Sequence, residues 1–224
     1  MCGVIGVYLD HVTPAQIEKV KKLILCSAIR GVHATGISYL RNGYVQTIKE
    51  HGPPEKFFEH QNIEGCIDNA TLCLIAHTRY STSDLRFNQP LGNPQIAICH
   101  NGVISQSAPE NWEKEFNLKT KTANDSELIL QSLNGGEHPL TKFQGSMAVC
   151  GITYKEIFAF RNHERPLWYH QEENGAVFAS TRDILLRSGF DNPQKCKMFV
   201  EYVVRDGVLT EQQYPIPKGI TDLQ

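Results

Sequence analysis

Two fully apolar runs, each followed directly by a cluster of polar residues, constrain the fold of this chain most strongly. Residues 72–76 (Leu-Cys-Leu-Ile-Ala) have the length and composition of a buried strand, and the polar residues 77–81 (His-Thr-Arg-Tyr-Ser) follow them. Residues 96–99 (Ile-Ala-Ile-Cys) repeat this pattern and lead into residues 100–102 (His-Asn-Gly). The sequence therefore predicts two buried strands that end in polar clusters.

Further strands and several helices are predicted around these two runs. Short runs bounded by Gly, Pro or Asn predict strands at residues 4–9, 37–40, 44–48, 147–152, 156–160, 167–169 and 176–179, with a last one near 207–209. Helical spacing and capping residues predict helices over residues 14–30, near 57–58, over 125–134 and over 181–187. The four strands between residues 146 and 180 are expected to form one antiparallel meander. This order favours an α+β layered domain, with residues 1–224 forming one domain that ends in an irregular tail at 211–224.

The composition argues against several classes of function. With 41% hydrophobic residues and a formal net charge of -2, the chain has no electrostatic bias toward nucleic acid or an anionic membrane, and neither is expected as a partner. Its seven cysteines form no Cys-x-x-Cys pair and no zinc-site spacing, so neither a disulfide framework nor a bound metal is expected. No signal peptide or long apolar segment is recognisable, which predicts a cytoplasmic protein.

The second residue of the chain is a cysteine, and its position has chemical meaning. If Met1 is removed, Cys2 carries a thiol and a free α-amine, and an α-amine with a pKa of ~7.7–8.0 can accept the thiol proton near neutral pH. The apolar residues 4–9 place Cys2 at the exposed start of a strand. A cysteine after a start methionine is usually an ordinary residue, so its meaning here depends on its partners further along the chain.

Seven short motifs occur in an order and at a spacing that resemble the class II glutamine amidotransferases, over roughly residues 2–210. The likeness is greatest to the glutaminase domains of amidophosphoribosyltransferase and glucosamine-6-phosphate synthase. It implies the Ntn-hydrolase fold, a four-layer αββα sandwich with two facing antiparallel sheets, and an N-terminal cysteine nucleophile. The motifs are Cys2-Gly3, Arg30-Gly31-x-x-x-x-Gly36, His77-Thr78-Arg79-Tyr80-Ser81, Asn88-Gln89-Pro90, His100-Asn101-Gly102, Asn124-Asp125-Ser126-Glu127 and Arg165-Pro166-Leu167.

The resemblance implies a catalytic or binding role for five residues. Cys2 would attack the side-chain amide of glutamine and form a γ-glutamyl thioester. The side chain of Asn101 and the backbone N–H of Gly102 would form the oxyanion hole. Arg79 would bind the α-carboxylate of glutamine and Asp125 its α-ammonium group, a pair that selects free glutamine.

The same resemblance suggests a loop that closes over the substrate. Thr78, Tyr80 and Ser81 would lie on this loop, with Tyr80 as an aromatic lid that keeps water from the thioester. Residues 32–35 depart from the family, because Val-His-Ala-Thr replaces its usual proline or glutamine, aspartate, serine and alanine.

Four further residues are expected to support the site. His77 and His100 are interpreted as structural, bonding backbone groups near the site, because the mechanism already has its base. Arg30 and Gly36 have two open interpretations: they orient the Cys2 region, or they end a helix and turn the chain.

The function expected on this basis is a glutamine amidohydrolase that releases ammonia from L-glutamine without a cofactor or metal. No second catalytic domain is recognisable, so a separate synthase subunit is expected to accept the ammonia, with residues 83–87 and 214–218 as candidate docking surfaces. Two alternatives stay open: a free-standing Ntn amidase that acts on another γ-glutamyl amide, and a non-catalytic glutamine-binding subunit. Assembly into a homo-oligomer also stays open.

Overall fold

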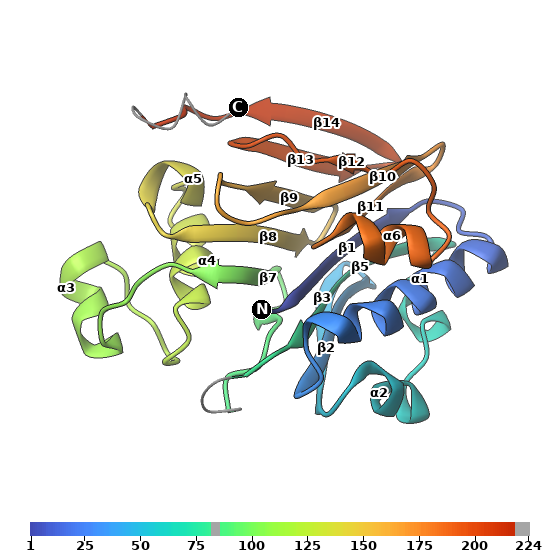
Figure 1. Cartoon of the computed structure of the whole chain (residues 1–224), viewed down its shortest axis with the longest axis horizontal. Helices are drawn as coiled ribbons and strands as arrows, with labels where there is room; N and C mark the ends of the chain where they lie inside the picture. The colour runs from blue at the N-terminus through green and yellow to red at the C-terminus, as the bar shows by residue number, and fades with distance from the viewer. Residues whose placement is uncertain (82–85, 218–224) are drawn as a thin grey trace.

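A computed structural model describes residues 1–81 and 86–217 and shows two β-sheets stacked between helices (Figure 1). Within these residues, the order across the larger sheet is β12 (Gln194–Lys195), β10 (Trp168–Glu172), β11 (Gly175–Ala179), β1 (Gly3–Leu9), β5 (Thr71–Arg79), β2 (Ala34–Arg41) and β3 (Tyr44–His51), with β4 (Ile67–Asp68) beside β5. The order across the smaller sheet is β14 (Val208–Gln213), β13 (Val200–Arg205), β9 (Ile157–Arg161), β8 (Ser146–Thr153), β7 (Ile96–Val103) and β6 (Leu91–Gly92). Neighbouring strands pair antiparallel in both sheets.

Helices cover the outer face of each sheet. The larger sheet packs against α1 (Pro14–Cys26), α2 (Pro54–His60) and α6 (Arg182–Arg187), and the smaller sheet packs against α3 (Trp112–Phe116), α4 (Ser126–Asn134) and α5 (Pro139–Lys142). Short 3₁₀ helices lie at Ser27–Arg30, Glu64–Cys66 and Pro109–Asn111. The order helix, sheet, sheet, helix is the four-layer αββα sandwich, so the predicted fold class is confirmed.

Local sequence signals account for the start of the first helix. Thr13 and Gln16 form a reciprocal capping box, and Pro14 occupies the first helical position. The expected helix over residues 14–30 is observed, except that its last four residues tighten into the 3₁₀ helix Ser27–Arg30.

Alternation along the central strands separates the core into three layers. In β5, Cys73 and Ile75 face the space between the sheets, whereas Leu72 and Leu74 face the helices of the larger sheet. Successive side chains of a strand point to opposite faces, so a strand covered on both faces is apolar throughout. This is why residues 72–76 form an unbroken apolar run.

The predicted meander between residues 146 and 180 is wrong. β8 and β9 pair with each other in the smaller sheet, whereas β10 and β11 pair in the larger sheet, where β11 lies next to β1. The chain therefore crosses from one sheet to the other between β9 and β10. The apolar pattern of a strand predicts that it is buried but does not say which strand it pairs with.

The predicted tail also needs a correction. β14 extends to Gln213, so irregular structure begins at residue 214 rather than at 211. Of the two docking surfaces expected from the sequence, residues 83–85 and residue 218 lie outside the described residues.

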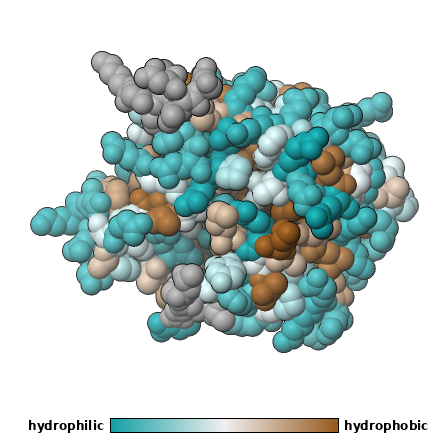
Figure 2. All heavy atoms as spheres, in the orientation of Figure 1, coloured by the Kyte–Doolittle hydropathy of each residue, from teal (hydrophilic) through white to brown (hydrophobic). Residues whose placement is uncertain are grey.

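The surface seen in Figure 2 is largely hydrophilic, with hydrophobic side chains in small groups. Across the part of the chain that the structure describes, no helix is long and apolar enough to cross a membrane. In the same residues, no group of three or more His, Cys, Asp or Glu side chains is placed to hold a metal ion.

Candidate active site

Strand alternation brings three of the predicted residues to one end of the space between the sheets. Arg79 lies an even number of positions along β5 from Cys73 and Ile75, so its side chain points to the same face, the inner face of the larger sheet. Asn101 follows Cys99 by two positions in β7, so its side chain also points inward. Cys2 precedes β1, and Figure 1 shows the N-terminus close to β7. The two sheets thus contribute opposite walls of one site.

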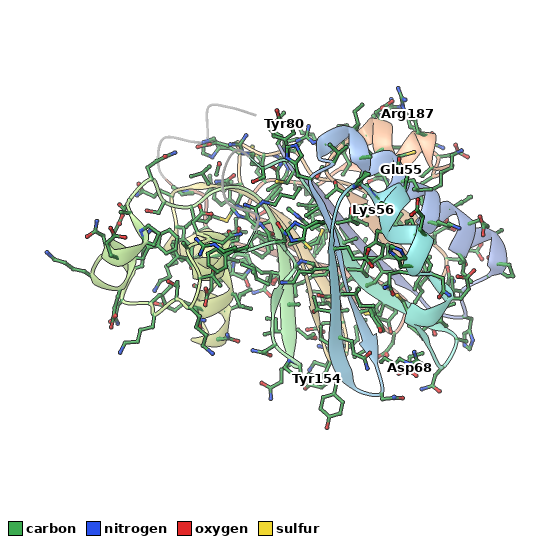
Figure 3. All side chains as sticks on the ribbon, turned by 90° about the horizontal axis from the view of Figure 1, so that it is seen from below. Glu55, Lys56, Asp68, Tyr80, Tyr154 and Arg187 are labelled. Carbon is green, nitrogen blue, oxygen red and sulfur yellow. The ribbon has the colours of Figure 1, made fainter. Side chains whose placement is uncertain are left out.

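A pocket of about 920 Å³ opens at this end of the sandwich. Figure 3 shows Tyr80 at this end, with Asp68 and Tyr154 at the opposite end of the molecule. Eight of the predicted site residues line the pocket: Cys2, Arg79, Tyr80, Ser81, His100, Asn101, Gly102 and Asp125. The lining also includes Met1, Arg86, Phe87, Gln89, Ser105, Gln106, Trp112, Asn124, Ser126 and Arg165.

Cys2 and Asn101 form a direct contact in the pocket. The Cys2 N–H donates to Oδ1 of Asn101 at 3.2 Å, so the amide NH₂ group of Asn101 faces away from this nitrogen. That Nδ2 atom is buried and has no hydrogen-bond partner among the described residues. An unpaired buried donor is costly, and it becomes favourable when a negatively charged oxygen forms beside it.

Gly102 continues the same strand beyond Asn101. Its φ of +155° is disfavoured for residues with a side chain, and a Cβ atom here would lie 1.9 Å from the carbonyl oxygen of Ser146. Only glycine therefore allows β7 to pass this close to β8.

Arg79 and Asp125 place a cation and an anion in the same pocket. Nη1 of Arg79 donates to Oδ1 of Asn88 at 2.6 Å, which orients the guanidinium group. Asp125 precedes α4, and its Oδ2 accepts from the backbone N–H groups of Ile104 and Ser105 at 2.5 and 3.4 Å. Opposite charges on two walls can bind the carboxylate and the ammonium of one small molecule.

His100 joins β7 to the start of α4. Its Nδ1 lies 2.8 Å from Oγ of Ser126, and its Nε2 lies 3.1 Å from the carbonyl oxygen of Ser146. Gln89 bonds the His100 backbone on both sides, accepting from its N–H at 2.6 Å and donating to its carbonyl at 3.2 Å. Burial lowers the pKa of His100, although nearby Asp125 acts in the opposite direction. The imidazole is thus a neutral, fully hydrogen-bonded connector.

His77 lies close enough to the backbone of His100 for that backbone to act on its pKa, in the raising direction, but the contact falls short of normal hydrogen-bond geometry. Both of its ring nitrogens are buried and have no hydrogen-bond partner within the described residues. Burial, reinforced by the charge of Arg79, lowers the pKa of His77 to about 3. His77 is therefore neutral over the physiological range of pH.

Thr78 does not lie on a substrate loop, which corrects the sequence-based expectation. β5 extends through Arg79, and alternation turns the fully buried Thr78 toward the helical layer, where its hydroxyl donates to the carbonyl of Ser27 at 2.9 Å. Its Oγ1 would lie 2.3 Å from a Cβ atom on Gly3. Thr78 thus packs beneath the first strand and does not line the pocket.

Arg30 and Gly36 also lie outside the pocket lining. Nε of Arg30 donates to the carbonyl of Cys2 at 3.4 Å, a contact that favours the interpretation in which Arg30 orients the Cys2 region. Burial lowers the pKa of Arg30. Gly36 lies inside β2, where a Cβ atom would approach the carbonyl oxygen of Gln89 to 2.4 Å, so it does not end a helix.

Several contributors were not assigned a role from the sequence. Asn88 orients Arg79, and Lys49 donates to the carbonyls of Asn88 and Pro90 at 3.0 and 3.2 Å. Arg165 lines the pocket and donates from Nε to Oγ of Ser146 at 3.1 Å. The motifs at residues 88–90 and 165–167 contain most of these residues, but a motif does not reveal which atoms meet.

The cysteines separate into two groups. All seven are free, and Cys73, Cys99 and Cys150 are buried in the core as predicted. Burial raises the pKa of these three thiols. Cys2 and Cys26 are half-buried, and of these two only Cys2 lines the pocket.

The glutamine amidotransferase domain family matches residues 61–224, so the chain belongs to this family. The fold matches two solved structures, the glutamine phosphoribosylpyrophosphate amidotransferase from B. subtilis complexed with ADP and GMP and an allosteric regulatory enzyme of purine biosynthesis, each with a TM-score of 0.76 and 19% identity. Each match covers 96% of this chain and 50% of the other, so the chain spans half the length of these proteins.

A glutamine aminotransferase class-II domain protein from Silicibacter pomeroyi has a similar fold, with a TM-score of 0.55 and 9% identity over 96% of this chain and 100% of that one. No curated protein sequence matches the chain. Membership of class II, predicted from the sequence motifs, is confirmed, and the chain is a glutamine amidotransferase domain.

Proposed function

We propose that this chain hydrolyses the side-chain amide of L-glutamine through a γ-glutamyl thioester on Cys2. The proposal rests above all on the contact between Cys2 and Asn101, because it sets a nucleophile beside a buried donor that has no partner among residues 1–81 and 86–217. Arg79 and Asp125 in the same pocket supply the two charges that a free α-amino acid requires.

The active form lacks Met1. While Met1 is attached, the Cys2 nitrogen is part of a peptide bond and cannot accept a proton. Removing Met1 converts this nitrogen into an α-amine. Oδ1 of Asn101, which lies 3.2 Å from the nitrogen while Met1 is attached, can hold the amine beside the thiol. Met1 is exposed, and its Sδ lies 3.5 Å from Nη2 of Arg30, so its removal uncovers the mouth of the pocket without disturbing the core.

Glutamine binds with its α-carboxylate on Arg79 and its α-ammonium on Asp125, which directs its amide carbon toward Cys2. Sγ attacks this carbon, and the carbonyl oxygen becomes an oxyanion that accepts from Nδ2 of Asn101 and the N–H of Gly102. The α-amine takes the thiol proton and delivers it to the leaving nitrogen. The C–N bond breaks, ammonia departs, and the γ-glutamyl thioester remains.

Water then completes the reaction. It attacks the thioester carbon while the α-amine of Cys2 takes a proton from it. The C–S bond breaks, Sγ regains a proton, and glutamate leaves. Tyr80 and Ser81, which line the pocket, limit the access of water while ammonia is still present.

Ammonia passes to an acceptor enzyme on a separate subunit. Glutamine amidotransferase domains generally pass ammonia to a synthase domain or subunit, which supports an ammonia-accepting partner for this chain. The seven free cysteines support a reducing compartment, and we assign the protein to the cytoplasm.

Intact-mass analysis with an electrophilic glutamine analogue tests the proposal. We expect a mature mass that lacks Met1 and one adduct that disappears in Cys2→Ala and persists in Cys26→Ala, the matched control at the other half-buried cysteine. Retained Met1 together with no adduct would overturn the proposal. A substrate panel in which glutamine is inert and a γ-glutamyl conjugate is cleaved would instead identify an amidase for another γ-glutamyl amide.

A further inference from the structure

We propose that His33 is a positioning residue for glutamine binding, because its imidazole holds the chain that follows β5 at the wall of the pocket. This inference rests on the proposed function. It adds a residue that does not line the pocket and lies in residues 32–35, where the sequence departs from its family.

Two contacts of the imidazole carry the inference. Nδ1 of His33 accepts the backbone N–H of Ser81 at 2.9 Å, which places the ring proton on Nε2. The ring also lies against Tyr80, with 5.1 Å between ring centroids and 32° between the planes. One side chain thus contacts two consecutive residues of the pocket lining.

These contacts act where the sheet no longer holds the chain. The pairing of β2 with β5 ends at the pair Ala34 and Arg79, so Tyr80 and Ser81 lie one and two residues beyond the ladder. Tyr80 is 53% exposed, so its side chain lies at the surface rather than in the core. The bond from Ser81 to His33 therefore extends the support of the chain two residues past the strand, next to Arg79.

The backbone of His33 is itself held on both sides. Its N–H donates to the carbonyl of Arg79 at 2.9 Å, and its carbonyl accepts from Gly52 at 3.0 Å. Gly31 approaches so closely that a Cβ atom there would lie 2.2 Å from the carbonyl carbon of Arg79. The imidazole thus projects from a fixed base, and its bond to Ser81 limits how far the chain after Arg79 can move.

Three variants separate the two contacts. His33→Ala removes both, His33→Asn keeps an acceptor near the position of Nδ1 but removes the ring, and His33→Phe keeps a ring but removes the acceptor. We expect His33→Ala and His33→Phe to raise the KM for L-glutamine about five- to tenfold with kcat within about twofold, and His33→Asn to restore most of the loss. Val32→Ala, an exposed neighbour, serves as the matched control.

Two further measurements distinguish positioning from general damage. The rate at which iodoacetamide alkylates Cys2 should not change, because this reagent needs no amino-acid recognition. Amide hydrogen exchange at Ser81 should be faster in His33→Ala and His33→Phe than in the wild type. The role of His33 would be overturned if KM and the exchange rate were unchanged in both variants. It would also be overturned if Cys2 were alkylated more slowly by the same factor as glutamine binding is weakened, or if His33→Asn failed to restore binding.

The exchange measurement also separates this inference from the proposed function. If the wild type forms no adduct with the glutamine analogue, the proposed function fails, and slow exchange at Ser81 that depends on His33 would still establish the contact. If the wild type forms the adduct and the variants behave like it in both assays, only the role of His33 fails.

Discussion

Strands β5 and β7 each carry a buried histidine and each contribute a site residue, Arg79 and Asn101, to the same pocket, but the two sheets hold the histidines differently. On β7, His100 is hydrogen-bonded through both ring nitrogens and both backbone groups, and it connects the strand to α4. On β5, neither ring nitrogen of His77 has a partner within the described residues. The histidine of β7 is held by a polar network, whereas the histidine of β5 is held by strand register and close packing.

The difference shows which substitutions alter stability as well as chemistry. Breaking a satisfied buried network leaves donors or acceptors unpaired, which costs about 1–3 kcal/mol for each group. Replacing a polar side chain that has no partner removes no such bond. We therefore expect changes in the β7 wall to affect folding and activity together, and changes in the β5 wall to affect activity more selectively.

The largest effect is expected at Asn101. Asn101→Ala removes the buried Nδ2 donor and should lower kcat by about 10²–10³, as the loss of one oxyanion-hole donor does. Steady-state release of ammonia from glutamine measures this, with Gln106→Ala, an exposed residue of the same pocket lining, as the control. A loss smaller than about tenfold would contradict the oxyanion role of Asn101.

The next effect compares two opposite charges of the pocket, those of Arg79 and Asp125. Asp125→Asn keeps an oxygen for the Ile104 and Ser105 N–H groups but removes the negative charge, and Arg79→Gln removes the positive charge. Each should lower kcat/KM for glutamine about 10- to 150-fold, the value of a charge-assisted bond of about 1.5–3 kcal/mol. Alkylation of Cys2 by iodoacetamide should stay unchanged. If either variant had the same kcat/KM for glutamine as the wild type, the binding role assigned to that residue would be contradicted.

The third prediction concerns the network itself. His100→Leu leaves the hydroxyl of Ser126 and the carbonyl of Ser146 without the imidazole, so the free energy of unfolding should fall by about 2–4 kcal/mol. Urea unfolding at pH 7.5 measures the change. His77→Leu is the matched variant on the other wall, and an equally large loss there would remove the contrast between the two strands.

The smallest effect at neutral pH is expected for His77→Leu, with a change in unfolding free energy below about 1 kcal/mol. Because burial lowers the pKa of His77 to about 3, the unfolded chain binds a proton more readily than the folded one below pH ~6.5. The wild type should thus lose about 2 kcal/mol from this residue between pH 7.5 and pH 5, and the variant should not. Urea unfolding of both proteins at the two pH values tests this, and an identical pH dependence would contradict the effect.

Much of the pocket was predictable because strand alternation is encoded locally. The apolar runs at residues 72–76 and 96–99 established two buried strands, and parity within them places Arg79 and Asn101 on inner faces. The error at Thr78 shows the limit of this argument. Thr78 belongs to a strand or to a loop depending on the residue at which β5 ends. That residue depends in turn on pairing with distant residues such as Gly3 and Thr35.

By itself, the sequence determined the family, the layered fold class and eight of the residues that line the pocket, because these follow from ordered motifs and from alternation along single strands. Only the tertiary structure decided that β10 and β11 leave the sheet of β8 and β9, that Asn88 orients Arg79 and that His33 bonds Ser81. It also decided that the ring nitrogens of His77 are buried without a hydrogen-bond partner in the part of the chain that the structure describes. The physical reason is that strand pairing and side-chain hydrogen bonds join residues far apart in the chain, whose meeting no local pattern records.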